Sequence, residues 1–310
     1  MPRIDRALCA AALSFITLFS TTAAAGAATL APLPKPDRSF DAGNLHVDVF
    51  GSGSQAMIFI PGLASGPWSW SEQIAHFSPS YTVYALTLPG FDGHPFGNPS
   101  DDLLANFTTN FWTFIASNSI TKPIVIGHSL GGTLAIDLAE QHPDRLRAAI
   151  ALDGLPIIPT LAQSTTAQRD AVATRLTAQI ASQTHDQVLA YEVRYMKTIG
   201  TIDPELAPVL AAECAKSDPK AIAAWGAADL RSDLRSSLKS ATVPILELMP
   251  YAKPSPYTQA QTQQFYEMLL TGAPNAKVVA IPGARHFAMI DQPAEVDAAI
   301  TQFLAALPPA

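Results

Sequence analysis

The chain has 310 residues, of which 48% are hydrophobic and 15% charged, so it is too apolar for a disordered protein and long enough for one large domain with an insertion. The formal net charge is -7, and the sequence contains neither a basic cluster nor a GxxxxGK phosphate-binding motif. We therefore expect no nucleic-acid partner and no electrostatic attraction to an anionic membrane.

Residues 1–27 are typical of a secretory signal peptide. Arg3 and Arg6 precede an apolar run over residues 7–19, and small residues follow, with cleavage expected after Ala25 or Ala27. The apolar run is shorter than the roughly 20 residues that a membrane-spanning helix needs. We therefore expect an exported protein, periplasmic or extracellular, with no stable membrane span after cleavage.

Alternating strand and helix patterns follow a Pro-rich lead-in at residues 28–44. Short apolar runs typical of β-strands lie at residues 45–49, 57–60, 81–86, 124–126, 148–152, 243–248 and 278–281. Helical spacing separates many of these runs, and a last helix is expected from Pro293, where proline suits the first helical turn. This alternation predicts an α/β fold for residues 45–310, with a doubly wound, mostly parallel sheet.

The segment from about residue 154 to 240 breaks this alternation. It is rich in Ala, Leu and Gln at helical spacing and contains no convincing strand. We expect a helical cap inserted into the domain, folding over the carboxyl edge of the sheet, where open α/β sheets bind their ligands.

The most informative motif lies at residues 123–132, with the sequence PIVIGHSLGG. An apolar strand runs into a Gly-His-Ser-Leu-Gly turn and then into a helical pattern, which places Ser129 at the apex of the turn. The glycines at 127 and 131 leave room for a sharply turned serine. This arrangement predicts a nucleophilic serine, although Gly-x-Ser-x-Gly alone is a weak pattern.

Together with the Leu-Pro-Gly-Phe turn at 88–91, the loop at 61–66 and His286, this elbow resembles the α/β-hydrolase superfamily of serine esterases and lipases over residues 45–307. The chain departs from the usual pattern in two places. Many relatives carry His-Gly where this chain has Pro61-Gly62, and they usually show an aspartate just before the turn at 88–91.

The resemblance places the general base on the loop after the last strand, where the sequence has His286. The commoner position for the third triad member is the loop after the strand at 243–248, yet residues 249–264 contain no carboxylate. Some members of the fold place the acid after the preceding strand instead, which here ends in Asp153. We therefore expect Asp153 to orient His286, with Glu247 as the main rival.

The same resemblance predicts an oxyanion hole formed by two backbone N–H groups. One belongs to Leu130, directly after the serine, and the other to Leu63, in the loop after the strand at 57–60. Asp229 and Asp233 are expected at surface or capping positions ahead of the strand at 243–248.

The predicted activity is hydrolysis of an uncharged, moderately hydrophobic carboxylic ester, a small-molecule substrate, by a Ser-His-Asp acyl-enzyme mechanism. No cofactor or metal is expected, since HExxH and paired CxxC spacings are absent. Two alternatives stay open: a C–C bond or amide hydrolase with the same triad, and a non-catalytic ligand-binding protein on the same fold. The sequence does not indicate the oligomeric state.

Overall fold

The computed structural model describes residues 28–97 and 102–308, so the predicted signal peptide at 1–27 lies outside the described residues. Its centre is an eight-stranded sheet in the order β1-β2-β4-β3-β5-β6-β7-β8. The pairs β1–β2 and β2–β4 are antiparallel, and all the other neighbours are parallel. The strands are β1 (Arg38–Ala42), β2 (Leu45–Phe50), β3 (Ala56–Ile60), β4 (Thr82–Thr87), β5 (Ile124–His128), β6 (Ala148–Leu152), β7 (Ile245–Tyr251) and β8 (Ala276–Pro282).

The seven predicted strands correspond to β2 through β8, and the predicted α/β fold class is confirmed. The strand that the sequence did not indicate is β1, which lies within the predicted lead-in and pairs with β2 across a tight turn. Its side chains are mostly exposed because it is an edge strand, so it lacks the apolar run that marks a buried strand.

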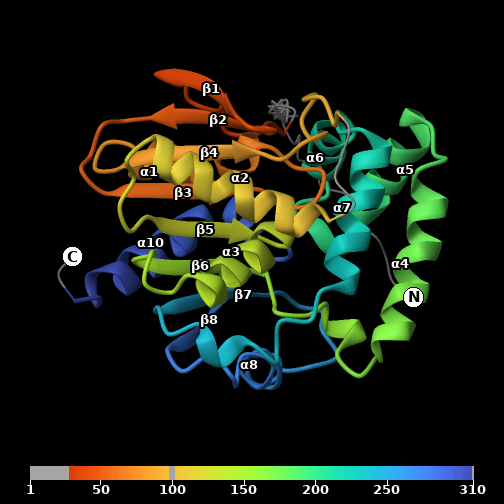
Figure 1. Ribbon diagram of the computed structural model, residues 1–310. Helices are drawn as coiled ribbons and strands as arrows, with labels where there is room; N and C mark the ends of the chain where they lie inside the picture. Colours follow the sequence, from red (N-terminus) through yellow and green to blue (C-terminus); the bar gives the residue numbers. More distant parts are fainter. Residues whose placement is uncertain (1–27, 98–101, 309–310) are drawn as a thin grey trace, which may run out of the picture.

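The helices that flank the sheet are α1 (Ser71–Phe77), α2 (Leu103–Ser117), α3 (Leu130–Gln141), α8 (Gln259–Leu269), the single turn α9 (Ala288–Asp291) and α10 (Pro293–Ala305). Figure 1 shows α2 and α3 in front of the sheet and α10 behind it. The strands β3, β5 and β6 are therefore buried on both faces, which explains why their sequences are continuously apolar.

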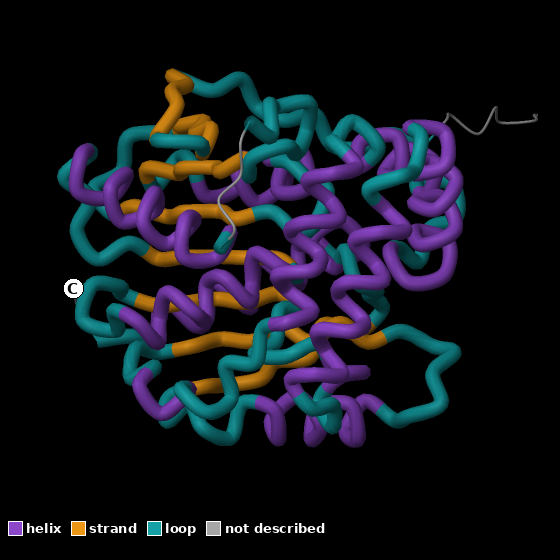
Figure 2. The backbone as a smooth tube through the Cα atoms, turned by 45° about the vertical axis from the view of Figure 1, so that its right-hand side comes forward, coloured by secondary structure: helices purple, strands orange, loops and turns teal. Residues whose placement is uncertain are grey.

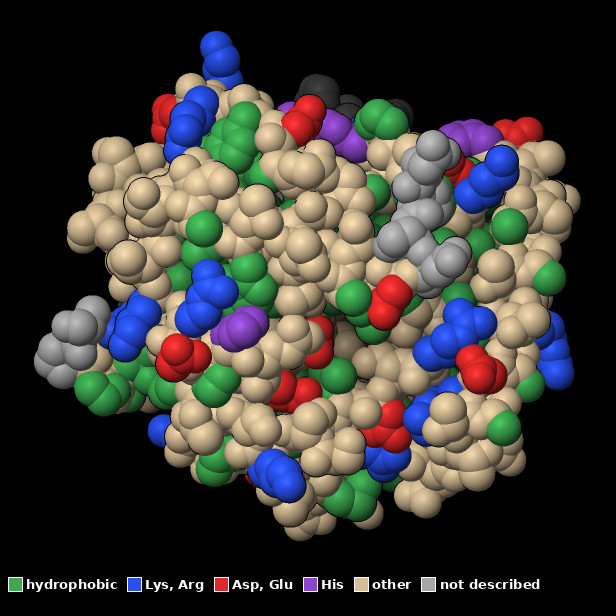
Figure 3. Space-filling view, in the orientation of Figure 1, with side chains coloured by type: hydrophobic (Ala, Val, Ile, Leu, Met, Phe, Trp, Pro, Cys, Tyr) green, Lys and Arg blue, Asp and Glu red, His purple; other side chains and the backbone are tan. Residues whose placement is uncertain are grey.

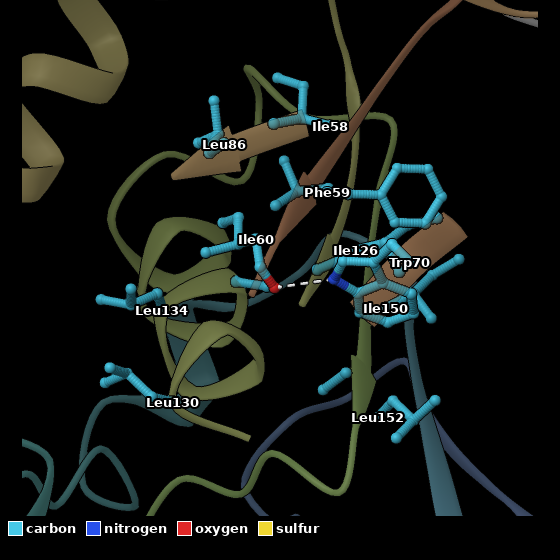
Figure 4. Close-up of a cluster of buried hydrophobic side chains, with 14 of the residues drawn as sticks. Ile58, Phe59, Ile60, Trp70, Leu86, Ile126, Leu130, Leu134, Ile150 and Leu152 are labelled. Carbon is cyan, nitrogen blue, oxygen red and sulfur yellow. Dashed lines mark hydrogen bonds between the residues drawn. The ribbon is translucent and has the colours of Figure 1, made fainter. Parts of the chain in front are cut away.

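The centre of the core lies between the elbow helix and the strands. Figure 4 shows Leu130 and Leu134 of α3 on one side of the strand residues and Trp70 on the other. The indole N–H of Trp70 donates to the carbonyl oxygen of Ile60 at 3.4 Å. This packing holds the start of α3 against the carboxyl end of β3, and so fixes the position of the turn between β5 and α3.

Between β6 and β7 the described chain forms helices and turns without a strand, and we call this segment the cap. Its main helices are α4 (Thr166–Ile180), α5 (His185–Tyr195), α6 (Ala207–Cys214) and α7 (Pro219–Arg231), with a π-helical turn, η3 (Met196–Gly200), after α5. Figures 1 and 2 show these helices gathered at the end of the sheet to which the parallel strands point. The surface seen in Figure 3 is hollowed where the cap meets the sheet-bearing part.

Candidate active site

Ser129 lies at the turn between β5 and α3 in a strained backbone conformation, with φ 52° and ψ -120°. Such a conformation costs a non-glycine residue about 1–3 kcal/mol, and it persists only where the surroundings impose it. Here the backbone N–H of Ser129 donates to Leu152 at 2.9 Å, and its carbonyl accepts from Gly132 at 2.8 Å. A Cβ on Gly127 would lie 1.9 Å from a backbone oxygen, so the turn requires glycine there.

His286 and Asp153 come together at the carboxyl edge of the sheet, from the loops that follow β8 and β6. The Nδ1 of His286 lies 2.5 Å from the Oδ2 of Asp153. A carboxylate only accepts hydrogen bonds, so this contact places the proton of a neutral imidazole on Nδ1 and leaves Nε2 free to accept. Of the two candidate acids named from the sequence, Asp153 is the one that contacts the histidine.

Asp153 has a second partner that the sequence did not indicate. The hydroxyl of Tyr266, on α8, donates to Oδ1 of Asp153, so each carboxylate oxygen has its own donor. Burial and the charge of Asp153 hold the pKa of Tyr266 well above its usual value, so the hydroxyl keeps its proton. The loop after β7 contains no carboxylate, but the helix that follows it, α8, carries the hydroxyl group that donates to Asp153.

Glu247, the rival acid, lies within β7 and is completely buried. Both of its carboxyl oxygens lack a hydrogen bond of normal geometry to any described residue. Burial first, and then the neighbouring charge of Asp153, raise its pKa well above the usual value, and weak interactions with the backbone N–H groups of Gly154 and Asp153 oppose this only in part. Its surroundings therefore favour the neutral form of Glu247, in contrast to an acid that stabilises an imidazolium.

His128, which precedes the serine, is a packing residue beneath the loop that carries His286. It is buried, its ring centroid lies 4.5 Å from that of His286, and its Nε2 lies 2.9 Å from the carbonyl oxygen of His286. Since a carbonyl only accepts, Nε2 carries the proton. Burial lowers the pKa of His128 well below its usual value, so it stays neutral beneath the histidine.

The two residues predicted to form the oxyanion hole lie on either side of Ser129. Leu130 is the first residue of α3, where the N–H groups have no partner within the helix. Leu63 lines the same cavity as Ser129. Among the described residues, neither backbone N–H has a hydrogen-bond acceptor. Gly62 allows the loop that carries Leu63 to pass close to His128 and Ser129. A Cβ at position 62 would lie 2.7 Å from His128 Nδ1 and 3.2 Å from Ser129 Cβ.

Two cavities adjoin Ser129 and His286. The smaller, of about 130 Å³, is lined by Leu63, His128, Ser129, Tyr191, Glu192, Tyr195, Met196, Asp229, His286 and Phe287. The larger, of about 400 Å³, is lined by Ser129, Thr133, Asp153, Leu155, Ile157, Ile158, Pro159, Tyr195, Ile199, Asp229, Tyr266 and His286. Residues of the cap thus line both cavities next to the serine, and the two cavities differ in the side chains that the cap contributes.

Two carboxyl groups of the cap, Glu192 on α5 and Asp229 on α7, line this site; we call them the cap carboxyl pair. The prediction that Asp229 lies at a surface or capping position is wrong, because α7 directs its side chain into both cavities. Burial raises the pKa of Asp229 to about 6 and that of Glu192 to about 7. Asp233, by contrast, pairs with Arg235 in a half-exposed ion pair.

The cap is also bonded to the loop that carries the histidine. The backbone N–H of Phe287 donates to Gly200 of η3 at 2.8 Å, and that of His286 donates to Ile199 at 3.2 Å. The guanidinium of Arg285 donates to the carbonyl oxygens of Lys197 and Thr201, both at 2.9 Å. These bonds tie the position of His286 to the fold of the cap.

Within residues 28–97 and 102–308, no cluster of His, Cys, Asp and Glu side chains has the arrangement of a metal site. None of the helices described there has the length and apolar character needed to span a bilayer.

Comparison with known proteins gives a consistent picture. A model of the alpha/beta hydrolase family matches residues 57–299. The 2-(acetamidomethylene)succinate hydrolase of Mesorhizobium japonicum is 25% identical over 289 residues, which cover 86% of this chain and 94% of that protein. The solved structure of a thermophilic esterase from Thermogutta terrifontis superposes with a TM-score of 0.68 at 19% identity, over 84% of this chain and 93% of that one.

Other relatives match over a shorter stretch. The human (lyso)-N-acylphosphatidylethanolamine lipase is 29% identical over 109 residues, which cover 34% of this chain and 32% of that protein. The chain therefore matches only about a third of the length of that relative.

Proposed function

Because the chain belongs to the alpha/beta hydrolase family, we propose that it is a serine hydrolase that cleaves carboxylic esters through an acyl-enzyme on Ser129. The observation that carries this proposal is the meeting of three features in one place. A strained serine at the elbow adjoins the same cavity as His286, and a carboxylate contacts the far nitrogen of that histidine.

In the first half of the reaction, Nε2 of His286 takes the hydroxyl proton of Ser129 while the serine oxygen attacks the ester carbonyl carbon. The carbonyl oxygen becomes an oxyanion that the N–H groups of Leu63 and Leu130 stabilise. The C–O bond to the alcohol then breaks, and His286 returns the proton to the departing alkoxide, so that a neutral alcohol leaves and an acyl-serine stays behind.

In the second half, His286 takes a proton from water, and the resulting hydroxide attacks the acyl-serine carbonyl. The tetrahedral intermediate collapses, and the serine oxygen recovers its proton from His286. The sum is one ester and one water converted to one acid and one alcohol. Throughout, Asp153 stabilises the imidazolium and holds the ring in the correct tautomer.

The larger cavity supports a moderately hydrophobic group on one side of the scissile bond. Leu155, Ile157, Ile158 and Pro159 line it next to Ser129. This aliphatic lining supports the hydrophobic character of the predicted ester substrate.

The proposal is tested with Ser129→Ala beside the parent protein on a panel of p-nitrophenyl esters of increasing chain length. We expect a loss of hydrolysis of at least about 10³-fold, together with loss of labelling by a fluorophosphonate probe. Hydrolysis that survives in the variant would refute the assignment of the nucleophile.

A second candidate is hydrolysis of an amide or C–C bond with the same triad, and the acetamido group in the name of the relative from Mesorhizobium favours the amide. The same panel extended with matched amides and diketones separates the two reactions. A non-catalytic binding protein on this fold would leave Ser129 unlabelled by the fluorophosphonate probe and would show no burst of acylation.

A further inference from the structure

The smaller cavity beside Ser129 contains a buried carboxyl group without a partner. Glu192 is only 8% exposed, yet it forms no hydrogen bond or ion pair with any described residue, and it lines the cavity that contains the serine. Asp229 lines the same cavity from the neighbouring helix α7. A buried carboxylate is costly unless a counter-charge or hydrogen-bond donors accompany it, so the site is incomplete as it stands.

The cavities hold little positive charge: His286 lines both of them, and its charge lowers the pKa of Asp229 without offsetting the effect of burial. Neither of the two cavities has a lysine or arginine among its lining residues. The arginines of the adjoining segments have other partners: Arg231 pairs with Asp170, Arg285 donates to backbone carbonyls, and the guanidinium of Arg194 lies over the ring of Tyr191, 5.9 Å from its centroid. The raised pKa values of the cap carboxyl pair, caused mainly by burial, agree with the absence of lysine and arginine from the lining.

Aromatic rings complete the lining of the smaller cavity. The rings of Tyr191 and Tyr195 are stacked with centroids 6.4 Å apart and an interplanar angle of 18°. Tyr195 also lies edge-on to His286, with centroids 6.1 Å apart, which places it next to the reacting groups. Aromatic faces attract cations within about 6 Å, and the interaction strengthens when the cation is desolvated.

The larger cavity is more apolar, and Asp153, which also lines it, is already bonded to His286 and Tyr266. It shares Ser129, Tyr195, Asp229 and His286 with the smaller one, but beyond them its lining is mostly aliphatic. A substrate whose scissile bond lies at Ser129 would therefore present an apolar group to one side and a small group to an acidic, aromatic side.

We infer that the substrate carries a positively charged amine on one side of its scissile bond, bound by Glu192, Asp229 and the ring of Tyr195, with an apolar group on the other side. This inference rests on the proposed function, and it replaces the sequence-based expectation of an uncharged ester. An anionic substrate, by contrast, would meet two carboxyl groups and no lysine or arginine. The succinate named for the Mesorhizobium relative therefore does not suit this cavity.

The test uses pairs of esters that have the same shape and differ only in charge. Butanoylcholine is compared with its carbon isostere, in which a tert-butyl group replaces trimethylammonium, so the charge lies in the alcohol. A second pair places the charge in the acyl group: ethyl 4-trimethylammoniobutanoate and its tert-butyl isostere. At pH 8 we expect the cationic member of at least one pair to have a kcat/KM about tenfold or more above that of its neutral partner.

The variant Glu192→Gln keeps the shape of the side chain and removes its charge, so we expect it to reduce the ratio of cationic to neutral kcat/KM severalfold, mainly through KM. The matched control is Glu205→Gln, which removes one negative charge from an exposed position of the cap. A control variant that lowers the ratio as much as Glu192→Gln would overturn the inference, because the effect would then be a long-range one.

The outcomes separate this inference from the proposed function. Equal hydrolysis of both members in both pairs overturns the cationic substrate and leaves the serine esterase intact. Should no ester react, calorimetric titration of Ser129→Ala with tetramethylammonium chloride decides the inference alone. Saturable binding that Glu192→Gln weakens supports it, and binding no different from that of sodium chloride overturns it.

Discussion

The substitution Asp153→Asn gives the sharpest test of how this site works, because Glu247 provides a matched comparison. The two carboxyl groups come from neighbouring strands, yet only Asp153 contacts His286, at 2.5 Å. An asparagine at 153 can present its amide group to Nδ1 and favour the wrong tautomer of the histidine. Loss of the orienting carboxylate from a triad costs about 10⁴-fold in kcat, which corresponds to about 5.5 kcal/mol of transition-state stabilisation.

Glu247→Gln should behave differently although the chemical change is the same. Glu247 is completely buried, and burial raises its pKa well above the usual value, which favours the neutral form. Glutamine replaces one neutral group with another of nearly the same shape. We expect kcat/KM to change by less than about threefold, since no charge is lost.

The assay is steady-state hydrolysis of p-nitrophenyl butanoate at pH 7.5 for the parent and both variants, with thermal unfolding as the check that each variant folds. A loss in Glu247→Gln comparable to that in Asp153→Asn would refute the reasoning, because it would show that the buried glutamate is ionised and acts on the histidine. Activity of Asp153→Asn within about tenfold of the parent would also refute the reasoning, because the carboxylate of Asp153 would then not be needed to orient His286.

Four further predictions follow from the same geometry. Tyr266→Phe leaves one oxygen of Asp153 without its donor, so kcat should fall about tenfold with little change in KM, as measured by steady-state kinetics. Gly62→Ala places a Cβ 2.7 Å from His128 Nδ1, and we expect a loss of about 1–3 kcal/mol in unfolding free energy together with lower activity. The cap carboxyl pair ionises with pKa values of about 6 and about 7, so the ratio of cationic to neutral ester hydrolysis should increase between pH 5 and 8; a flat ratio would contradict this. Folding raises the pKa of Glu192 from about 4.3 to about 7, so the unfolded chain loses this proton at lower pH and the stability of the folded protein falls as pH rises toward 7. Thermal unfolding should therefore show that Glu192→Gln stabilises the protein by up to about 3 kcal/mol at pH 8 and by little at pH 4.

The elements that were predicted well are those with a strong local signal. Strands such as β5 and β6 are covered on both faces, so each of their residues is buried and the run is apolar throughout. The edge strand β1 lacks that signal because most of its side chains are exposed. The predicted signal peptide and the export that it implies stay predictions, since residues 1–27 lie outside the described part of the chain.

The sequence by itself was sufficient to bring the candidates Ser129, His286 and Asp153 to one edge of the sheet. Each follows a strand, and parallel strands all end at the same edge, so knowledge of strand order is enough to place them. The absence of a carboxylate after β7 could also be read directly, and it directed attention to Asp153. The catalytic roles of these three residues stay predictions until the variants are measured.

The tertiary structure alone decided what surrounds them. Tyr266 meets Asp153 from a helix more than a hundred positions away, and the cap carboxyl pair comes from two helices whose own patterns give no sign of which side chains face the serine. The physical reason is that a cap helix is positioned by packing between distant segments, here by the bonds of η3 to the loop of His286, and not by the period of its own sequence. The chain order thus determines the edge of the sheet where chemistry can occur, whereas the packing of the cap determines which substrate can approach it.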